Sequence, residues 1–372
     1  MKFHSTCLLA MGTLLPVAFA EDKPKQAWPE TKSGHYVIED FKFDSGGKLD
    51  ELELHYQTLG KLKVHSDGST NAVFIMHGTT GLSEQFLNDD FAKVLFNPGQ
   101  VLDAEDYFII LRDGIGHGNS SRPSNTDLRA DFPSYQYSDM VRADHQLLTE
   151  HFGINHTRLH MGVSMGGMHT WMWGELYPDF MDALMPIASF PVQISGHNRL
   201  WRKFVLELIT RDPAWNGGDY KDEFLTGLAG ALLIQQVMLS SPTYWQREYP
   251  SRDAIDSYVE ELMPHIVDYD ANDQLYAWNA SHTYDPEADL GLIKAPLVAV
   301  NTADDWMNPA ELGILERTVN TLMKPGLGKA VTVPASKKTS GHDSYIKAEL
   351  WKDELQLLLA KTRAKRNAGC LA

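Results

Sequence analysis

The sequence predicts an α/β fold, with a mostly parallel, doubly wound sheet that carries an inserted helical segment. Short apolar runs alternate with amphipathic stretches along most of the chain, which is the pattern of parallel strands covered by helices on both faces. The interval 191–290 instead holds helix-like stretches and no convincing core strand. Because crossovers between parallel strands are right-handed, a doubly wound sheet is the simplest topology for these elements.

Alternating apolar and polar residues open the fold at Tyr36–Phe43 and Leu52–Thr58, and Gly or charged turns bound each stretch. This pattern predicts an antiparallel hairpin. Buried strands are then expected at Ala72–Met76, Tyr107–Leu111, Leu159–Val163, Leu184–Ala188, Leu297–Val300 and Ala330–Val333.

The predicted domain organisation is a core made of residues 21–190 and 291–372, interrupted by a helical lid at 191–290. Helix-like stretches in this insertion are Arg202–Thr210, Lys221–Leu239 and Arg252–Val267. Ligands of open α/β sheets bind at the carboxyl edge of the strands, so we expect the inserted helices to cover that edge. The alternative is an ordinary second domain elsewhere on the molecule.

Residues 1–20 are predicted to be a signal peptide. Lys2 gives a positive start, a mostly apolar stretch runs from Cys7 to Phe19, and Ala18 and Ala20 supply small residues for cleavage before Glu21. A secreted or periplasmic protein is therefore expected. The alternative is a cytosolic chain with an unstructured start.

Composition excludes several classes of partner. The chain has a net charge of −16, which argues against binding nucleic acid or docking on an anionic membrane. No apolar run after the N-terminus is long enough to span a bilayer. Removal of the signal leaves Cys370 as the only cysteine, so neither an intramolecular disulfide nor a cysteine metal site is expected. No metal or cofactor is predicted, the expected partner is a small acyl substrate, and a homodimer is left open.

The most specific motif is Gly162-Val163-Ser164-Met165-Gly166-Gly167. It follows a predicted buried strand and precedes a stretch that can continue as a helix. Glycines around the serine allow a tight strand-to-helix turn that presents its hydroxyl at the edge of the sheet. We therefore predict that Ser164 is the nucleophile of an α/β-hydrolase fold.

A serine hydroxyl needs a base, and the base needs a carboxylate that fixes its tautomer. In this fold the acid comes first and the histidine last along the chain. Asp304 and Asp305 follow the strand at 297–300, and His342 lies in a Gly-flanked loop after the last strand. The sequence predicts His342 as the base and favours Asp305 over Asp304 as the acid. His160, within a strand, is expected in the core.

Backbone amides must also stabilise the oxyanion. The turn His77–Gly81 follows the first central strand, and Thr79 is best placed there to supply an N–H group. Met165, directly after the nucleophile, is expected to supply the other. His117, in a nearby Gly-rich loop, is interpreted as loop structure next to the site.

These motifs resemble the homoserine O-acetyltransferase branch of the α/β-hydrolases over residues 36–360. The stretches that carry the resemblance are His77–Gly81, Asp113–Gly118, Gly162–Gly167, Asp212–Tyr220, Asp268–Asn272, Asp305–Pro309 and Gly341–Asp343. The resemblance implies a Ser164–His342–Asp305 triad, an oxyanion hole at Thr79 and Met165, and a helical lid.

The resemblance also implies a pocket for the amino-acid substrate, and this chain matches it only in part. Asp343 is retained at the position that would bind the substrate amine. The position expected to hold an arginine for the substrate carboxylate, six residues before Asp212, is Leu206, and Arg202 and Arg211 are offset from it.

Three functional hypotheses follow. The leading one is a secreted serine hydrolase that acts on an ester or related acyl substrate through an acyl-enzyme, because Leu206 and the leader both depart from the transferases. The alternative is a CoA-dependent O-acyltransferase of the homoserine O-acetyltransferase type, with acetyl-CoA as acyl donor. A third is a non-catalytic binding protein on the same fold.

Overall fold

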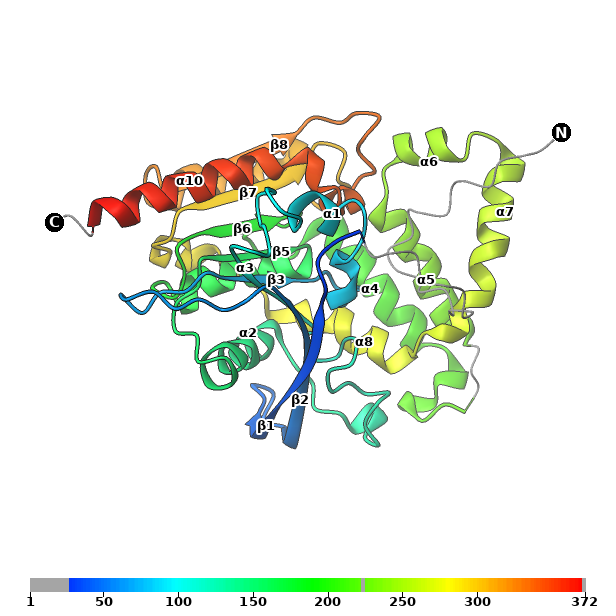
Figure 1. Ribbon diagram of the computed structural model, residues 1–372. Coiled ribbons are helices and arrows are strands. Elements are labelled where there is room, and N and C mark those ends of the chain that lie inside the picture. The colour runs from blue at the N-terminus through cyan, green and yellow to red at the C-terminus, as the bar shows by residue number, and fades with distance from the viewer. Residues whose placement is uncertain (1–26, 222–224, 370–372) are drawn as a thin grey trace.

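The computed structural model describes residues 27–221 and 225–369. Its centre is a sheet of eight strands in the order β1-β2-β4-β3-β5-β6-β7-β8 (Figure 1). The strands are β1 (Lys32–Lys42), β2 (Lys48–Leu59), β3 (Ala72–Met76), β4 (Phe108–Arg112), β5 (Leu159–Val163), β6 (Leu184–Ile187), β7 (Leu297–Thr302) and β8 (Gly328–Val333).

The predicted fold class is confirmed. β1 and β2 form the expected antiparallel hairpin, β2 continues antiparallel to β4, and every other neighbouring pair is parallel. All residues of β3, β4 and β5 are buried. Burial on both faces explains why these strands appear in the sequence as continuous apolar runs rather than as alternating ones.

Helices cover both faces of the sheet. α1 (Ala92–Leu95) and the start of α10 (Lys352–Gly369) pack with β3, β5 and β7 in one apolar cluster that includes Trp351 and Leu355. α2 (Tyr137–Gln146), α3 (Met165–Leu176) and α9 (Ile314–Thr321) pack on the opposite face around Trp171 and Trp173. His160 is buried in this second cluster, against the ring of Trp173, as expected.

The interval between β6 and β7 forms the helices α4 (Gly196–Thr210), α5 (Thr226–Leu239), α6 (Pro242–Glu248), α7 (Arg252–Leu262) and α8 (Ala271–Asn279). In Figure 1 they lie together at one side of the sheet. α4, α5 and α8 share an apolar cluster of their own. The helical stretch predicted to reach Val267 leaves α geometry after Leu262, where Pro264 removes a backbone donor. That these helices act as a lid remains a prediction.

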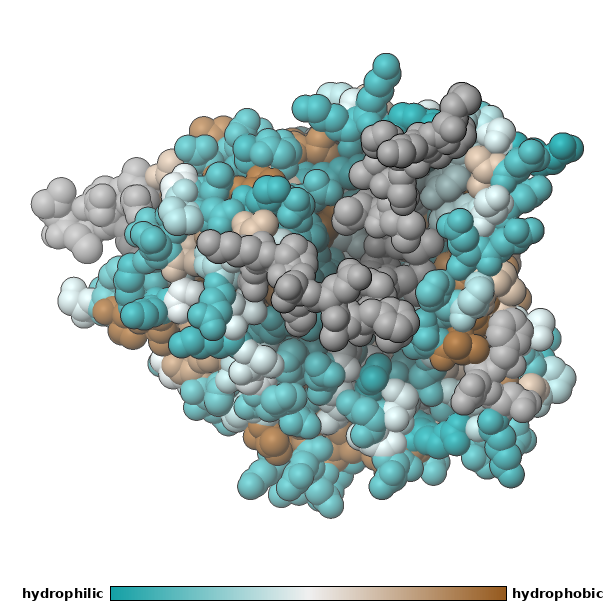
Figure 2. Space-filling view, turned by 45° about the vertical axis from the view of Figure 1, so that its right-hand side comes forward, coloured by the Kyte–Doolittle hydropathy of each residue, from teal (hydrophilic) through white to brown (hydrophobic). Residues whose placement is uncertain are grey.

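The predicted signal peptide, residues 1–20, lies outside the described residues. Within the part that is described, no helix is long and apolar enough to cross a membrane. The face of the molecule in Figure 2 is mainly hydrophilic, with hydrophobic residues in small scattered groups.

Candidate active site

Ser164 lies between β5 and α3 in a strained backbone conformation, with φ 52° and ψ −112°. A positive φ is uncommon for a residue with a side chain and is retained where the surrounding structure enforces it. Here the Ser164 N–H donates to the Ile187 carbonyl of β6 at 2.9 Å, and the Ser164 carbonyl accepts from the Met168 N–H at 2.9 Å. The turn is therefore fixed from both sides.

Two glycines of the motif allow this turn because the backbone passes very close to itself. A Cβ on Gly162 would lie 2.2 Å from the Gly166 oxygen, and one on Gly166 would lie 2.0 Å from the Met76 oxygen. Neither approach leaves room for a side chain. The sequence motif and the observed turn thus have the same steric cause.

His342 bridges Ser164 and Asp305. Its Nε2 lies 2.8 Å from the Ser164 Oγ, and its Nδ1 lies 2.8 Å from the Asp305 Oδ2. All three residues are buried. The tautomer that fits carries its hydrogen on Nδ1 and donates it to Asp305, leaving Nε2 to accept the serine proton. The structure therefore brings together the three residues predicted for the triad.

The carboxylate of Asp305 is held ionised by its surroundings. Burial by itself would raise its pKa, but the charge of His342 and hydrogen bonds from His342 and Asn308 hold the pKa below its usual value. The backbone N–H groups of Met307 and Asn308 donate to Oδ1 at 2.7 and 3.0 Å, and the Asn308 side chain donates to Oδ2 at 3.1 Å. The sequence alone indicated no role for Asn308, although this residue lies within the stretch Asp305–Pro309 that carries the family resemblance.

Asp304 has a different position from its neighbour. Its Oδ2 accepts hydrogen bonds from Ser241 of the inserted segment at 3.1 Å, from the Thr339 hydroxyl at 2.9 Å and from the Gly341 N–H at 3.2 Å. It therefore anchors the loop that carries His342 but does not contact the imidazole. This geometry favours Asp305 over Asp304, as the sequence did.

The predicted oxyanion hole lies beside Ser164. A Cβ on Gly78 would lie 3.4 Å from the Ser164 Cβ, which places the turn after β3 against the serine. Within the described residues, the N–H groups of Thr79 and Met165 donate no hydrogen bond. They are thus free to donate to an oxygen bound next to Ser164.

Two buried histidines, His77 and His117, pack around the turn that carries Thr79. The His117 Nε2 lies 2.8 Å from the Thr79 carbonyl oxygen. Burial lowers the pKa of His117 to about 4, so this ring is neutral near pH 7. His77 accepts from Arg112 and from the Gly114 N–H, and burial followed by the charge of Arg112 lowers its pKa as well. His117 therefore lies between two carbonyl oxygens, with its Nδ1 2.9 Å from that of Ile115, and the single N–H of the neutral ring can donate to one of them. This is a more specific position than the loop structure expected from the sequence.

Asp343 and Leu206 stand at the two positions expected to bind an amino-acid substrate, and their surroundings differ in polarity. Asp343 follows His342 and is partly buried, and desolvation raises its pKa to about 7. Its Oδ1 has no hydrogen-bond partner among the described residues. Leu206, by contrast, belongs to the apolar cluster of the inserted helices. The structure thus leaves Asp343 as a polar group beside the site and gives Leu206 an ordinary packing position.

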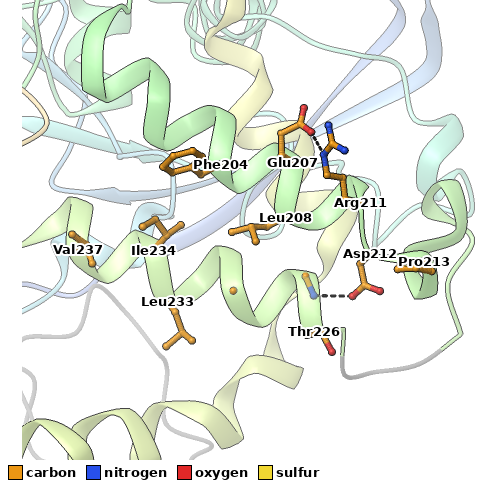
Figure 3. A pocket seen from close by; sticks show the side chains of 12 residues that line it. Phe204, Glu207, Leu208, Arg211, Asp212, Pro213, Thr226, Leu233, Ile234 and Val237 are labelled. Carbon is orange, nitrogen blue, oxygen red and sulfur yellow. Dashed lines mark hydrogen bonds and ion pairs between the residues drawn. The ribbon is translucent and has the colours of Figure 1, made fainter.

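An apolar groove of about 920 Å³ lies between α4 and α5 (Figure 3). Phe204, Leu208 and Ile234 line it, together with the Glu207–Arg211 ion pair at its rim. None of the residues predicted for the active site line this groove. No group of metal-binding side chains occurs within the described residues.

Comparison with known proteins identifies the family of the chain. The family model described as the alpha/beta hydrolase fold matches residues 71–319. A homoserine O-acetyltransferase from Pelobacter propionicus is 30% identical over 352 residues, covering 83% of this chain and 91% of the relative. A probable acyltransferase from Methanothermobacter thermautotrophicus is 30% identical over 284 residues, covering 76% and 86% of the two chains.

Solved structures show the same fold. An acetylester hydrolase from Corynebacterium glutamicum has a TM-score of 0.76 at 24% identity and covers 88% of this chain and 96% of its own. A homoserine O-acetyltransferase from Bacillus anthracis has a TM-score of 0.75 at 20% identity, covering 88% and 97%. Together with the sequence relatives, these matches show that the chain belongs to the α/β-hydrolase family, in its homoserine O-acetyltransferase-like group.

Proposed function

We propose that the protein is a serine acyl-transfer enzyme in which Ser164, His342 and Asp305 form the catalytic triad. The observation that carries the proposal is the position of His342, which lies 2.8 Å from both the Ser164 Oγ and the Asp305 Oδ2. Such a chain of hydrogen bonds allows an imidazole to remove the proton of an attacking hydroxyl.

The first half-reaction forms an acyl-enzyme. The Ser164 oxygen attacks the carbonyl carbon of the donor as its proton passes to the His342 Nε2. The carbonyl oxygen becomes an oxyanion that accepts hydrogen bonds from the N–H groups of Thr79 and Met165. When the tetrahedral intermediate collapses, the leaving group departs with the proton from His342 and the acyl group remains on Ser164.

The second half-reaction is assigned to an alcohol acceptor. His342 removes the proton of the acceptor hydroxyl, which attacks the acyl carbon, and Ser164 recovers its proton. The sequence alone favoured a secreted hydrolase, but the relatives are named as homoserine O-acetyltransferases and a probable acyltransferase. They support the alternative better, namely O-acyl transfer. We propose an acyl-CoA such as acetyl-CoA as the acyl donor.

Ester hydrolysis is the second candidate, and one observation favours it. Leu206 stands where the resemblance expects an arginine for the acceptor carboxylate, and it is buried in an apolar cluster. An acceptor site without that cation would bind an amino acid less firmly. Water would then compete for the acyl-enzyme.

The test follows the acyl group of acetyl-CoA and of p-nitrophenyl acetate with purified protein, with and without homoserine or other small alcohols. Wild type should form an acetyl adduct on Ser164, detectable by mass spectrometry, and Ser164→Ala should form none. CoA release that rises with added alcohol supports transfer, and release unaffected by any alcohol supports hydrolysis. If Ser164 reacts with neither donor nor with a fluorophosphonate probe, the protein is a non-catalytic member of the fold and the proposal is wrong.

A further inference from the structure

Arg202 of α4 is a fully buried cation without a carboxylate partner. Its Nε donates to the Asn198 side chain at 2.9 Å and its Nη1 to the Ser281 hydroxyl at 3.2 Å, and its guanidinium carbon lies 4.9 Å from the centre of the Trp278 ring. Within the described residues, no Asp or Glu lies within ion-pair distance of it and its Nη2 has no hydrogen-bond partner. Burying a charge in this way is costly, so a use for the charge is expected.

Tyr137, the first residue of α2, connects Arg202 with the turn after β3. Its hydroxyl is buried and faces the side chains of Arg202, Thr79 and Ser281. Desolvation raises the pKa of Tyr137, and Arg202, Thr79 and Ser281 oppose that rise. The Tyr137 Oη and the Thr79 Oγ1, like the Arg202 Nη2, make no hydrogen bond of standard geometry to any described residue. Three buried polar groups that lack a close partner therefore face one another beside the predicted oxyanion hole.

Thr79 therefore has one hydrogen-bonded side and one side that faces unpaired polar groups. His117 contacts its carbonyl oxygen at 2.8 Å, and Tyr137 with Arg202 behind it faces its side chain. A positive charge that is buried and unpaired acts over several ångströms, because the protein interior screens it far less than water does. The charge of Arg202, next to Tyr137, is therefore expected to favour the negative charge that develops near the Thr79 amide during acyl transfer.

We propose that Arg202 and Tyr137 are positioning residues of the oxyanion hole, which orient Thr79 and make its surroundings electropositive. This inference rests on the proposed function and deepens it. It also gives one of the inserted helices, α4, an indirect part in the chemistry, through the surroundings of Thr79. Neither residue contacts the reacting atoms, and an oxyanion forms in both acylation and deacylation, so their contribution should fall on the rates of both steps rather than on substrate binding.

The test compares Arg202→Met, Arg202→Lys and Tyr137→Phe with wild type on p-nitrophenyl acetate, a neutral ester. Loss of a direct oxyanion-hole donor costs about 10²–10³ in kcat, so Arg202→Met, which acts through Tyr137, should lower kcat about 10-fold or more at nearly constant KM. Arg202→Lys should recover part of the loss, because it restores the charge. Tyr137→Phe removes only a hydroxyl and should lower kcat several-fold while the protein stays folded. Arg199→Met is the matched control, since it removes a less buried charge from the same helix, and its kcat should equal that of wild type.

A second readout is the inhibition constant of a trifluoromethyl ketone, which forms a tetrahedral oxyanion on the serine. This constant should rise across the variants in proportion to the loss of kcat/KM, which a general loss of folding would not produce. If the variants keep wild-type kcat, Arg202 has only a packing role and the inference is wrong. If the only change is a higher KM for esters that carry a carboxylate, Arg202 binds substrate and the inference is also wrong. If wild type itself forms no adduct on Ser164, the proposed function fails and the inference fails with it. If wild type forms the adduct and the variants keep its kcat, the inference is wrong but the proposed function stands.

Discussion

Asp304 and Asp305 are neighbours in sequence that hold the histidine loop in two different ways. Asp305 accepts from the His342 ring at 2.8 Å, whereas Asp304 accepts from the Gly341 N–H at 3.2 Å. One carboxylate orients the imidazole, and the other fixes the backbone that carries it. Substitutions at the two positions should therefore have different effects.

Asp305→Asn is expected to lower kcat by about 10⁴-fold with little loss of stability, because the amide stabilises the wrong tautomer of His342. Asp304→Ala should instead lower the free energy of unfolding by about 1–3 kcal/mol, since it leaves buried donors around Gly341 unpaired. Steady-state kinetics and urea unfolding of both variants check this division. The larger loss of activity in the Asp304 variant would contradict it.

Asn308→Ala is expected to lower kcat about 10-fold. Its side chain links Asp305 to the Ala188 carbonyl, with hydrogen bonds of 3.1 and 3.0 Å, and groups that orient a reacting constellation matter because small displacements are costly. The measurement is kcat on an activated ester. Asn125→Ala, whose amide binds the Ser120 carbonyl outside the site, is the control.

Gly166→Ala should be strongly destabilising, by about 3 kcal/mol or more, because a Cβ would lie 2.0 Å from the backbone oxygen of Met76. Gly291→Ala is the matched control, since its Cβ would meet only the Leu322 oxygen at an ordinary 3.7 Å. Thermal unfolding of both variants checks this. Similar melting temperatures would show that the elbow tolerates a side chain.

Asp343 should make the protein less stable as the pH rises. Desolvation raises its pKa to about 7, so the folded state disfavours ionisation of this carboxyl. The resulting cost is absent below its unfolded pKa of about 3.9, grows as the pH rises, and is complete above about pH 7.

Asp343→Asn, which cannot ionise, should therefore raise the melting temperature relative to wild type more at pH 8 than at pH 4.5. Asp353→Asn, at an exposed carboxylate on α10, is the matched control. An equal gain at both pH values would contradict the assignment.

The signal peptide remains a prediction from Lys2, the apolar stretch and the Ala18-Phe19-Ala20 site. We expect the mature protein to begin at Glu21 and to be exported. Intact-mass measurement of protein from the source organism checks the start, and replacing Ala18 and Ala20 with arginine should block processing. A full-length chain in the cytosol would contradict the prediction.

The strands and their order along the chain could be predicted because strands that are buried on both faces, such as β3 and β5, consist of continuous apolar runs. Strand ends were less certain, since Asn301 and Thr302 extend β7 with polar side chains that the apolar run excluded. The roles of neighbouring carboxylates, such as Asp304 and Asp305, can be distinguished only when the backbone conformation, and with it the direction of each side chain, is known.

The relation between Tyr137 and Arg202 had no signal in the sequence. The two residues come from helices on opposite sides of β5 and β6 in the chain, and each by itself resembles an ordinary core or surface residue. Tertiary packing alone brings them together.

Ser241, the residue that caps α6, ties the inserted segment to the loop of the base: its N–H binds the Ser340 carbonyl at 3.3 Å and its hydroxyl binds Asp304 at 3.1 Å. Any movement of the inserted segment that displaced α6 would therefore break hydrogen bonds that hold the loop of His342 in position. If the inserted helices move to admit substrate, we therefore expect the movement to leave α6 in place, because opening this contact would also release the loop that positions the catalytic base.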